Sequence, residues 1–308
     1  MTLLRPLYYC FRSVIVFILL LTNVASFSQT TDLKTEYLIH PIGIDEPLPR
    51  FTWRMNDTHA GAKQQSYRIL VDKDSLALLN QNGINWNANW IPSDQTLVTY
   101  SGKPLEPFTK YYWRVDLNNQ TNHSSISSFE TGMMQMSNWK GSWISDNIDI
   151  NLKPAPYFRK AFTATKKIKS ARAYIAVAGL YELYINGKKI GDHSLDPMYT
   201  RFDRRTLYLT HDVTKELATG KNAIGVLLGN GWYNHQSTAV WDFDKANWRA
   251  RPTFCMDLRI TYEDGSIETI SSGKDWKTSL SPVIFNSIYT AEHYDARKEI
   301  EGWNLSGF

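Results

Sequence analysis

One stretch of the sequence combines large aromatic side chains with carboxylates and amides. It reads LLGNGWYNHQSTAVWDFDKANW and covers residues 227–248. Aromatic rings can stack on the apolar faces of sugars, while carboxylates and amides can bind hydroxyl groups. The alternative is structural, because each tryptophan here can also be a buried residue at the rim of a β-sandwich. The candidate carbohydrate contacts are Asn230, Trp232, Asp242 and Asp244, with Asp196 in the sequence DHSLDP as a weaker candidate.

The two aspartates of the WDFD sequence raise the question of acid–base catalysis. If the chain is extended here, Asp242 and Asp244 point to the same side, about 6–7 Å apart. That separation is near the range of an inverting glycosidase pair. However, two acids on one strand would share one environment and could not easily flank a sugar bond from opposite sides. A solvated loop or a ligand or calcium site is therefore favoured, and we expect no catalytic residue.

Other signatures of catalysis or metal binding are absent. The sequence contains no HExxH, CxxC or GxSxG pattern, which argues against a zinc site or a serine nucleophile. NIDIN at residues 147–151 begins like an EF-hand loop, but Leu152 and Phe158 stand where Gly and Glu are needed. A calcium site assembled from several loops stays open. The densest basic cluster is KKIK at residues 166–169, and a solvated face explains it better than a nucleic-acid site.

The N-terminus has the pattern of an export signal. Arg5 and Arg12 precede the apolar run at residues 13–21, and small residues follow at Ser26 and Ser28. This pattern predicts a signal peptide over residues 1–28 and a mature protein exported to the periplasm or beyond the cell. The apolar run is too short for a comfortable membrane span, so the mature chain is expected to have none.

The two cysteines support the same picture of the mature chain. Cys10 lies within the predicted signal peptide, so Cys255 would have no partner for an internal disulfide. An exported chain without disulfides must be stabilised by a hydrophobic core. The composition allows this, because 43% of the residues are hydrophobic.

The elements that must position these residues are predicted to be strands. Two-residue turns at Asn186-Gly187 and Asp264-Gly265 predict β-hairpins. DVTKELATG is the one helical candidate, with Asp212 as its N-cap and Gly220 as its stop. Short alternating runs separated by turn residues predict strands at 67–71, 96–100, 111–115, 173–177 and 181–185.

Two further patterns predict how the strands pack. FCMDLRITY should place Phe254, Met256, Leu258, Ile260 and Tyr262 on one face, and Cys255, Asp257 and Arg259 on the other. The spacing of Leu105, Pro107, Thr109 and Tyr111 resembles the tyrosine corner of fibronectin type III sandwiches. The chain is therefore predicted to be all-β, with two consecutive β-sandwiches that meet within residues 130–145.

Several long segments resemble bacterial α-L-rhamnosidases, in sequential order. They are HPIGIDEPLPRFTWRM (40–55), QQSYRILV (64–71), SARAYIAVAGLYELYINGKKIGDHSLDPMYTRFDRRTLYLTHDVTKEL (170–217), NAIGVLLGNGWY (222–233) and YDARKEIEGWNLSGF (294–308). The resemblance covers nearly all of the mature chain. It implies a fibronectin type III-like sandwich over residues 29–133 and a jelly-roll sandwich related to carbohydrate-binding modules over residues 134–308.

The resemblance also implies a function. In some members of the family the second domain binds rhamnose with the help of calcium. The resemblance therefore implies a rhamnose-containing carbohydrate as the partner. No cofactor is expected to be required, and calcium is the one candidate to test. The family's catalytic domain is an (α/α)₆ barrel further along the chain, and the sequence contains no helical pattern for it. We therefore expect a non-catalytic front portion, incomplete at its C-terminal side, that works with a downstream catalytic domain or chain. The alternative is a stand-alone exported carbohydrate-binding protein.

Overall fold

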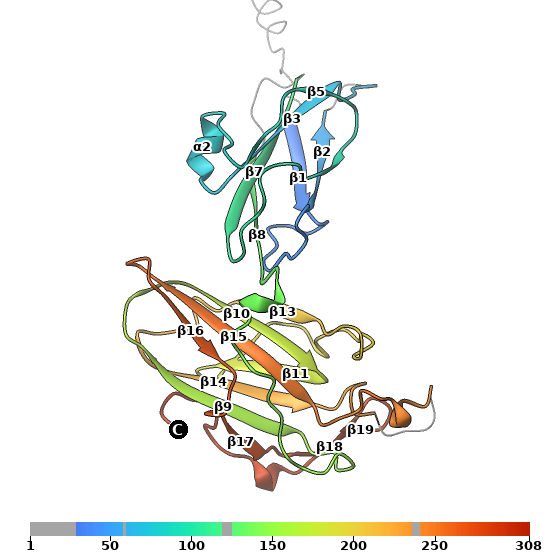
Figure 1. The fold of residues 1–308 in the computed structure, drawn as a ribbon, viewed down its shortest axis with the longest axis vertical. Coiled ribbons are helices and arrows are strands. Elements are labelled where there is room, and N and C mark those ends of the chain that lie inside the picture. The colour runs from blue at the N-terminus through green and yellow to red at the C-terminus, as the bar shows by residue number, and fades with distance from the viewer. Residues whose placement is uncertain (1–28, 58–59, 119–124, 236–240) are drawn as a thin grey trace, which may run out of the picture. The chain divides into compact units, whose positions relative to one another are not determined.

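The computed structural model describes residues 29–57, 60–118, 125–235 and 241–308. The predicted signal peptide lies outside these residues. The described chain divides into two compact units, one of residues 29–41 and 46–130 and one of residues 42–45 and 131–308. Both consist of antiparallel strands, which confirms the all-β prediction (Figure 1). None of the helices among the described residues is long and apolar enough to cross a membrane.

The first unit is a sandwich of two sheets. One sheet has the order β1-β2-β6, and the other has the order β4-β3-β7-β8 with β5 also paired to β3. The strands are β1 (Gln29–Thr35), β2 (Arg50–Asn56), β3 (Ser66–Asp72), β4 (Trp86–Asn87), β5 (Ile91–Pro92), β6 (Leu97–Thr99), β7 (Lys110–Leu117) and β8 (Ser127–Glu130), with a short helix α2 (Ser75–Leu79).

Aromatic residues from both sheets form the core of this unit. Phe51 of β2 stacks on Trp113 of β7 with ring centroids 4.5 Å apart, and both side chains are fully buried. The tyrosine corner is confirmed, because the Tyr111 hydroxyl accepts a 2.9 Å hydrogen bond from the backbone N–H of Glu106. This contact is structural and has no part in ligand chemistry.

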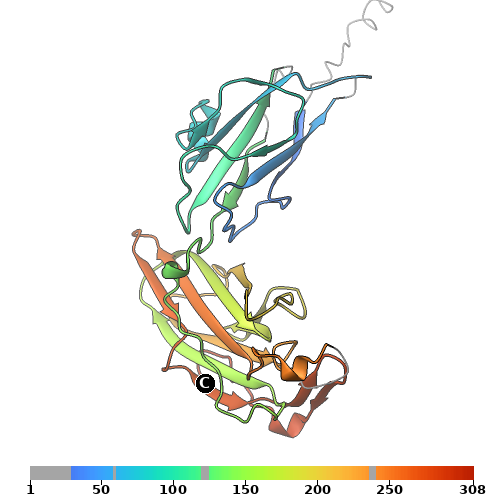
Figure 2. The ribbon, with the colours of Figure 1, turned by 45° about the vertical axis from the view of Figure 1, so that its right-hand side comes forward.

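The second unit is also a sandwich of two sheets, with a separate two-stranded sheet β18-β19 (Figure 2). The four-stranded sheet has the order β13-β10-β15-β16 and the five-stranded sheet has the order β12-β11-β14-β9-β17. The strands are β9 (Pro156–Ala164), β10 (Ile168–Ala178), β11 (Leu180–Ile185), β12 (Lys188–Ile190), β13 (Tyr208–Asp212), β14 (Gly220–Gly229), β15 (Thr253–Tyr262), β16 (Ile267–Ser271), β17 (Lys277–Leu280), β18 (Val283–Ser287) and β19 (Ala291–Tyr294). Among the described residues of this unit, three 3₁₀ turns complete the elements: η1 (Met136–Asn138), η2 (Phe243–Lys245) and η3 (Ala296–Lys298).

Strand β15 confirms the predicted alternation. Its five apolar residues at alternate positions all belong to the buried core between the two sheets. On its other face Cys255 and Asp257 are buried as well, because the segment before β9 crosses this face of the sheet. The backbone N–H of Lys140 donates to Asp257 Oδ2 at 2.7 Å. Gly141 allows this close approach, since a Cβ there would lie 2.6 Å from the carbonyl oxygen of Met256.

Cys255 is a free thiol, and burial raises its pKa to about 11. The thiol is therefore protonated at neutral pH and is a poor nucleophile. Its role is to fill space beneath the crossing segment.

Both predicted hairpins are present. Ile185 pairs with Lys188 across Asn186-Gly187, and both turn residues have positive φ, as a type I′ turn requires. Across the second hairpin, Gly265 has a φ of 81° and its N–H donates to the carbonyl oxygen of Tyr262. The N–H of Tyr262 in turn donates to the carbonyl oxygen of Ser266, so this hairpin has a three-residue turn that ends on Gly265, not the predicted two-residue turn.

The predicted helix over residues 212–220 is wrong. Asp212 ends β13 and its side chain accepts from the backbone N–H of Thr214, but only one turn follows. The buried side chain of Asn222 then bonds both the N–H and the carbonyl oxygen of Ala218. These side-chain bonds replace the backbone bonds that would continue a helix, so the segment becomes a compact loop.

Candidate functional site

The loop that follows β14 holds the candidate residues of the second unit. Gly231, the second residue of the loop, has a φ of 52°, and a Cβ at this position would lie 3.0 Å from Leu180 Cγ. Residues 236–240 of the loop lie outside the described residues. The two described parts of the loop carry the four candidates proposed there from the sequence.

Asn230 has a structural position. Its side chain is 1% exposed and donates to the carbonyl oxygens of Lys153 and Asn286, both at 3.2 Å. Its Oδ1 accepts from Asn234, and its backbone N–H donates to Asn286 Oδ1 at 2.7 Å. In this conformation Asn230 cannot contact a ligand, and it instead ties the loop to β18.

Trp232 lies at the centre of an aromatic cluster. Its half-buried ring has the rings of Tyr289 at 5.5 Å, Phe243 at 5.7 Å and Tyr199 at 6.1 Å. We define the aromatic cluster as Tyr199, Trp232, Trp241, Phe243, Trp248 and Tyr289.

The outer members of the aromatic cluster face solvent. Trp241 is 77% exposed, Tyr289 is 54% exposed and Tyr199 is 42% exposed. Exposed aromatic rings that converge from separate loops are unusual on a protein surface without a partner, and they can stack on a sugar. Trp232 therefore has a supporting position inside the cluster, whereas Trp241 is its most exposed ring.

The WDFD sequence is not extended, so the separation of about 6–7 Å considered for an extended chain does not apply. Asp242 has a φ of 52°, and residues 243–245 form the 3₁₀ turn η2. Asp242 is exposed and pairs with Lys245 at 3.3 Å, whereas Asp244 is half-buried. The backbone turns here because a left-handed residue initiates η2, so the two carboxylates do not share one environment.

Several polar atoms inside the loop have no partner within the described part of the chain. They include Asp244 Oδ1, Trp248 Nε1 and both ring nitrogens of His235, which is 2% exposed. Burial first, and the charge of Lys153 second, lower the pKa of His235. The ring is therefore neutral at neutral pH, and it packs as an aromatic side chain beside Trp232 at 5.2 Å.

Asp196 lies apart from the acidic pair, on the loop between β12 and β13. Its carboxylate is 3.4 Å from His193 Nδ1, and its backbone carbonyl accepts from the Tyr181 N–H at 3.0 Å. The hydroxyl of Tyr181 in turn bonds His211 Nε2 at 2.8 Å, and burial lowers the pKa of His211. The backbone of Asp196 therefore fastens its loop to β11, and its carboxylate lies beside the ring of His193.

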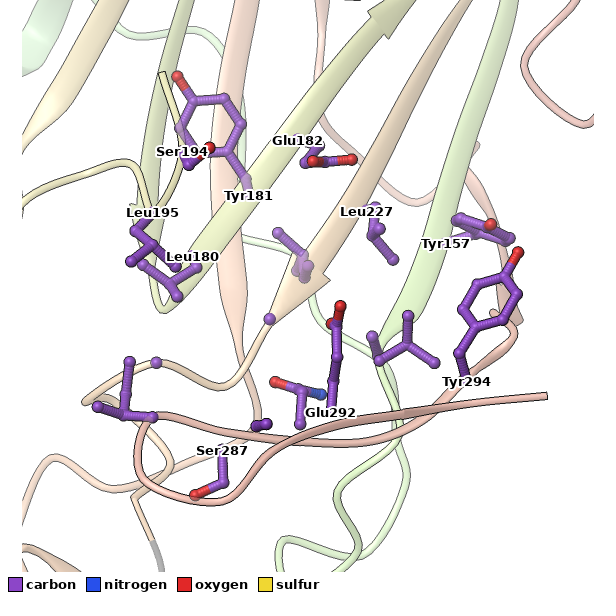
Figure 3. A pocket seen from close by; sticks show the side chains of 18 of the residues that line it. Tyr157, Leu180, Tyr181, Glu182, Ser194, Leu195, Leu227, Ser287, Glu292 and Tyr294 are labelled. Carbon is purple, nitrogen blue, oxygen red and sulfur yellow. The ribbon is translucent and has the colours of Figure 1, made fainter. Parts of the chain in front are cut away.

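A cavity of about 720 Å³ opens beside β11, and the sequence did not reveal it. It lies between the outer side of β9, β11 and β14 and the hairpin β18–β19 (Figure 3). In the figure, Glu182 and Leu227 project from the strands of the sheet, and Glu292 projects from the segment that crosses beneath them. The cavity thus brings together two carboxylates that are far apart in the sequence.

Glu182 is held in place inside the cavity. It accepts a hydrogen bond from the Tyr184 hydroxyl at 2.5 Å and pairs with Lys189. Burial alone would raise the pKa of Glu182, but these two hydrogen bonds outweigh burial and leave the pKa below its usual value. The carboxylate is therefore ionised at neutral pH, where it can accept hydrogen bonds but cannot act as a general acid.

The described residues offer no ready cation site. No group of three or more His, Cys, Asp or Glu side chains lies together anywhere in the described ranges.

Two family models match the chain. The Rha78A-like N-terminal immunoglobulin domain matches residues 30–135, and the α-L-rhamnosidase N-terminal domain matches residues 166–308. An α-L-rhamnosidase of Formosa agariphila is 31% identical, over 96% of this chain and 35% of the relative. One of Alteromonas sp. is also 31% identical, over 93% of this chain and 32% of the relative.

Solved structures of α-L-rhamnosidases are similar too. That from Dictyoglumus thermophilum has a TM-score of 0.83 at 38% identity, over 92% of this chain and 33% of that one. That from Streptomyces avermitilis, solved in complex with L-rhamnose, has a TM-score of 0.83 at 21% identity, over 91% of this chain and 44% of that one. At such low identity the second similarity shows the fold alone.

Most of the second unit matches the α-L-rhamnosidase N-terminal domain, and nearly the whole chain matches the curated α-L-rhamnosidases. The chain therefore corresponds to the N-terminal portion of these relatives, which confirms the resemblance found in the sequence. It spans about a third of the length of the two curated relatives, at 35% and 32%.

Proposed function

We propose that this chain is the non-catalytic front portion of an exported α-L-rhamnosidase and that its second domain binds rhamnosides. The observation that carries the proposal is the aromatic cluster, with Trp241 77% exposed above the half-buried Trp232. A stacked ring needs nearby hydroxyl-binding groups, and the exposed carboxylate of Asp242 is adjacent to Trp241. The relatives' names support rhamnosides as the class of ligand.

The non-catalytic role rests on the acids of the second domain. Glycoside hydrolysis needs one protonated carboxyl group and one ionised carboxylate on opposite sides of the sugar. Asp242 and Asp244 lie on one short turn, and Glu182 is held ionised by Tyr184 and Lys189. None of these three residues is arranged as a general acid.

Calorimetric titration of the mature protein with L-rhamnose tests this proposal. Stacking on one aromatic ring with a few hydrogen bonds gives millimolar affinity, or about 4 kcal/mol. The titration is repeated with calcium and with a chelator. Equal affinity with calcium and with the chelator would show that rhamnose binding does not depend on calcium. Binding only in the presence of calcium would show that the ion takes part. No heat at sugar concentrations far above the millimolar range would reject rhamnoside binding.

A further inference from the structure

Residues 303–308, which we call the latch segment, lie on the outer face of the five-stranded sheet. Both ribbon views show the C-terminus beside β9 (Figures 1 and 2). The indole of Trp303 stacks on Tyr157 of β9, with ring centroids 3.9 Å apart, and meets Tyr184 of β11 edge-on at 5.6 Å. Gly225 of β14, the strand between these two, pairs with Tyr184 and lies under the indole. One aromatic side chain thus contacts three neighbouring strands.

Gly225 makes room for the indole. A Cβ at this position would lie 2.7 Å from Trp303 Cζ3 and 3.0 Å from Asn304 Cβ, so a larger residue would force the latch segment away from the sheet. Gly225 is not one of the glycines with a positive φ, so the strand backbone itself does not require glycine here. The close approach of the segment is therefore what a glycine permits at this position.

A second attachment lies further along the latch segment. Arg159 Nη2 of β9 donates to the carbonyl oxygen of Leu305 at 2.9 Å and to that of Phe308 at 3.1 Å. The guanidinium also lies over the ring of Phe308, 5.4 Å from its centroid. The side chain of Leu305 reaches the hairpin at Gly187, where a Cβ would lie 2.5 Å from Leu305 Cδ2. The indole and the guanidinium therefore hold different parts of the segment on the same sheet.

The latch segment depends on these side chains, because its backbone hydrogen bonds are local. The N–H groups of Trp303, Leu305 and Phe308 each donate to a carbonyl oxygen three residues earlier in the chain. Leu305 is 47% exposed and Phe308 is 63% exposed, so little apolar surface is buried beyond Trp303. Segments with few buried contacts open locally, without unfolding of the domain that they cover.

We propose that residues 303–308 form a latch that opens and closes independently of the sandwich and that controls one wall of the cavity beside β11. Tyr157 and Tyr184 both line this cavity. When the latch is closed, Trp303 covers one face of the Tyr157 ring and restrains Tyr184. When it is open, both tyrosines lose this support, so any event that pulls the segment off the sheet alters the cavity. The inference goes beyond the proposed function, because neither a sugar nor the aromatic cluster takes part in it.

Two variants test the latch from its two sides. Gly225→Ala blocks the position of the indole on the sheet, and Trp303→Ala removes the indole from the segment. Hydrogen exchange measured by mass spectrometry should be about tenfold faster across residues 303–308 in each variant, because each loses the aromatic contact that holds the segment closed. The thermal midpoint of the second unit should stay near that of the wild type.

A second measurement tests the link to the cavity. Oxidation of the Tyr157 side chain by hydroxyl radicals, read by mass spectrometry, reports its exposure to solvent. The rate should rise in Gly225→Ala and in Trp303→Ala, because the indole no longer covers the ring.

Each variant has a matched control in the same unit. Gly273→Ala adds the same methyl group at a glycine without a positive φ, where the nearest atom, Asp275 Oδ1, would be 3.7 Å away. Trp143→Ala removes a tryptophan that is 47% exposed and has no ring contact with the latch segment among the described residues. Both controls should show the wild-type exchange across residues 303–308 and the wild-type oxidation of Tyr157.

Faster exchange confined to residues 303–308, with more oxidation of Tyr157, would support the latch. Wild-type exchange in both folded variants would overturn it. Faster exchange throughout the second unit would also overturn it, because the segment would then be part of the sandwich core. Unchanged oxidation of Tyr157 in variants with an open segment would overturn control of the cavity wall. If Gly225→Ala does not fold, Trp303→Ala decides the result. None of these outcomes depends on whether the protein binds rhamnosides.

Discussion

Trp232 is half-buried and Trp241 is exposed. Substitution of Trp232 should therefore affect mainly stability, and substitution of Trp241 should affect mainly ligand binding. Trp241→Ala should leave the thermal midpoint unchanged and weaken L-rhamnose binding about tenfold, because it removes one stacked ring worth about 1.4 kcal/mol. Trp232→Ala should destabilise the second unit by about 2 kcal/mol or more, because it leaves a cavity in the cluster. Thermal unfolding and calorimetry measure both effects.

The matched control for these two variants is Trp143→Ala. Trp143 is 47% exposed in the same unit and lies outside the aromatic cluster. This substitution should change neither the midpoint nor the affinity. Unchanged binding in Trp241→Ala would remove the cluster from the proposed site.

His235 should make the second unit sensitive to mild acid. Its pKa is lowered in the fold, so below the unfolded value of about 6.5 the unfolded chain binds a proton that the folded chain does not. Stability is therefore complete above about pH 6.5 and is lost as the pH falls below it. In His235→Phe the drop in unfolding free energy from pH 7.5 to 5.5 should therefore be smaller than in the wild type.

Urea unfolding at the two pH values measures this difference. His193→Gln is the control, because the side chain of His193 is 70% exposed. It should show the wild-type drop. A drop in His235→Phe equal to that of the wild type would contradict the argument.

Asn222 organises the loop between β13 and β14 and the adjacent hairpin. It is fully buried, it bonds Ala218 twice, and its Oδ1 accepts from Asn186 at 2.8 Å. Asn222→Ala leaves several buried polar groups without partners and should cost about 3 kcal/mol. Chemical unfolding measures the loss, and exposed Asn247→Ala should be neutral. A loss below about 1 kcal/mol would show that water replaces these bonds.

Sequence patterns predicted the strands and hairpins because their signals are local. Alternation along β15 and the Asn186-Gly187 turn each lie within one short segment. Residues 212–220, which were wrongly predicted to form a helix, also have the local residues that favour a helix. Asn222 overrode them through bonds to Ala218, and the burial of an asparagine side chain cannot be read from a helical pattern.

The candidate site was predictable only in part, because only some of its residues lie close together in the sequence. Trp232 and Trp241 stand in one conspicuous stretch, and the structure places both in one cluster. Glu182 and Glu292 line one cavity only because the β18–β19 hairpin lies against the five-stranded sheet. No spacing in the sequence links two residues on strands that do not pair with each other.

At the scale of the whole molecule, the first prediction concerns export. The basic flank, short apolar run and small residues before Gln29 predict removal of residues 1–28 in the exporting cell. The intact mass of secreted protein should correspond to a chain that starts near Gln29. A secreted protein that retains residues 1–21 would contradict the predicted signal peptide.

The central claim is that this chain holds rhamnosides without hydrolysing them. Ligand-observed NMR with an aryl α-L-rhamnoside tests both halves in one sample of the mature protein. The account predicts saturation transfer to the rhamnosyl protons, including the C6 methyl group, and no free L-rhamnose beyond that in a protein-free blank after prolonged incubation. Absence of saturation transfer, or release of L-rhamnose well above the blank, would contradict it.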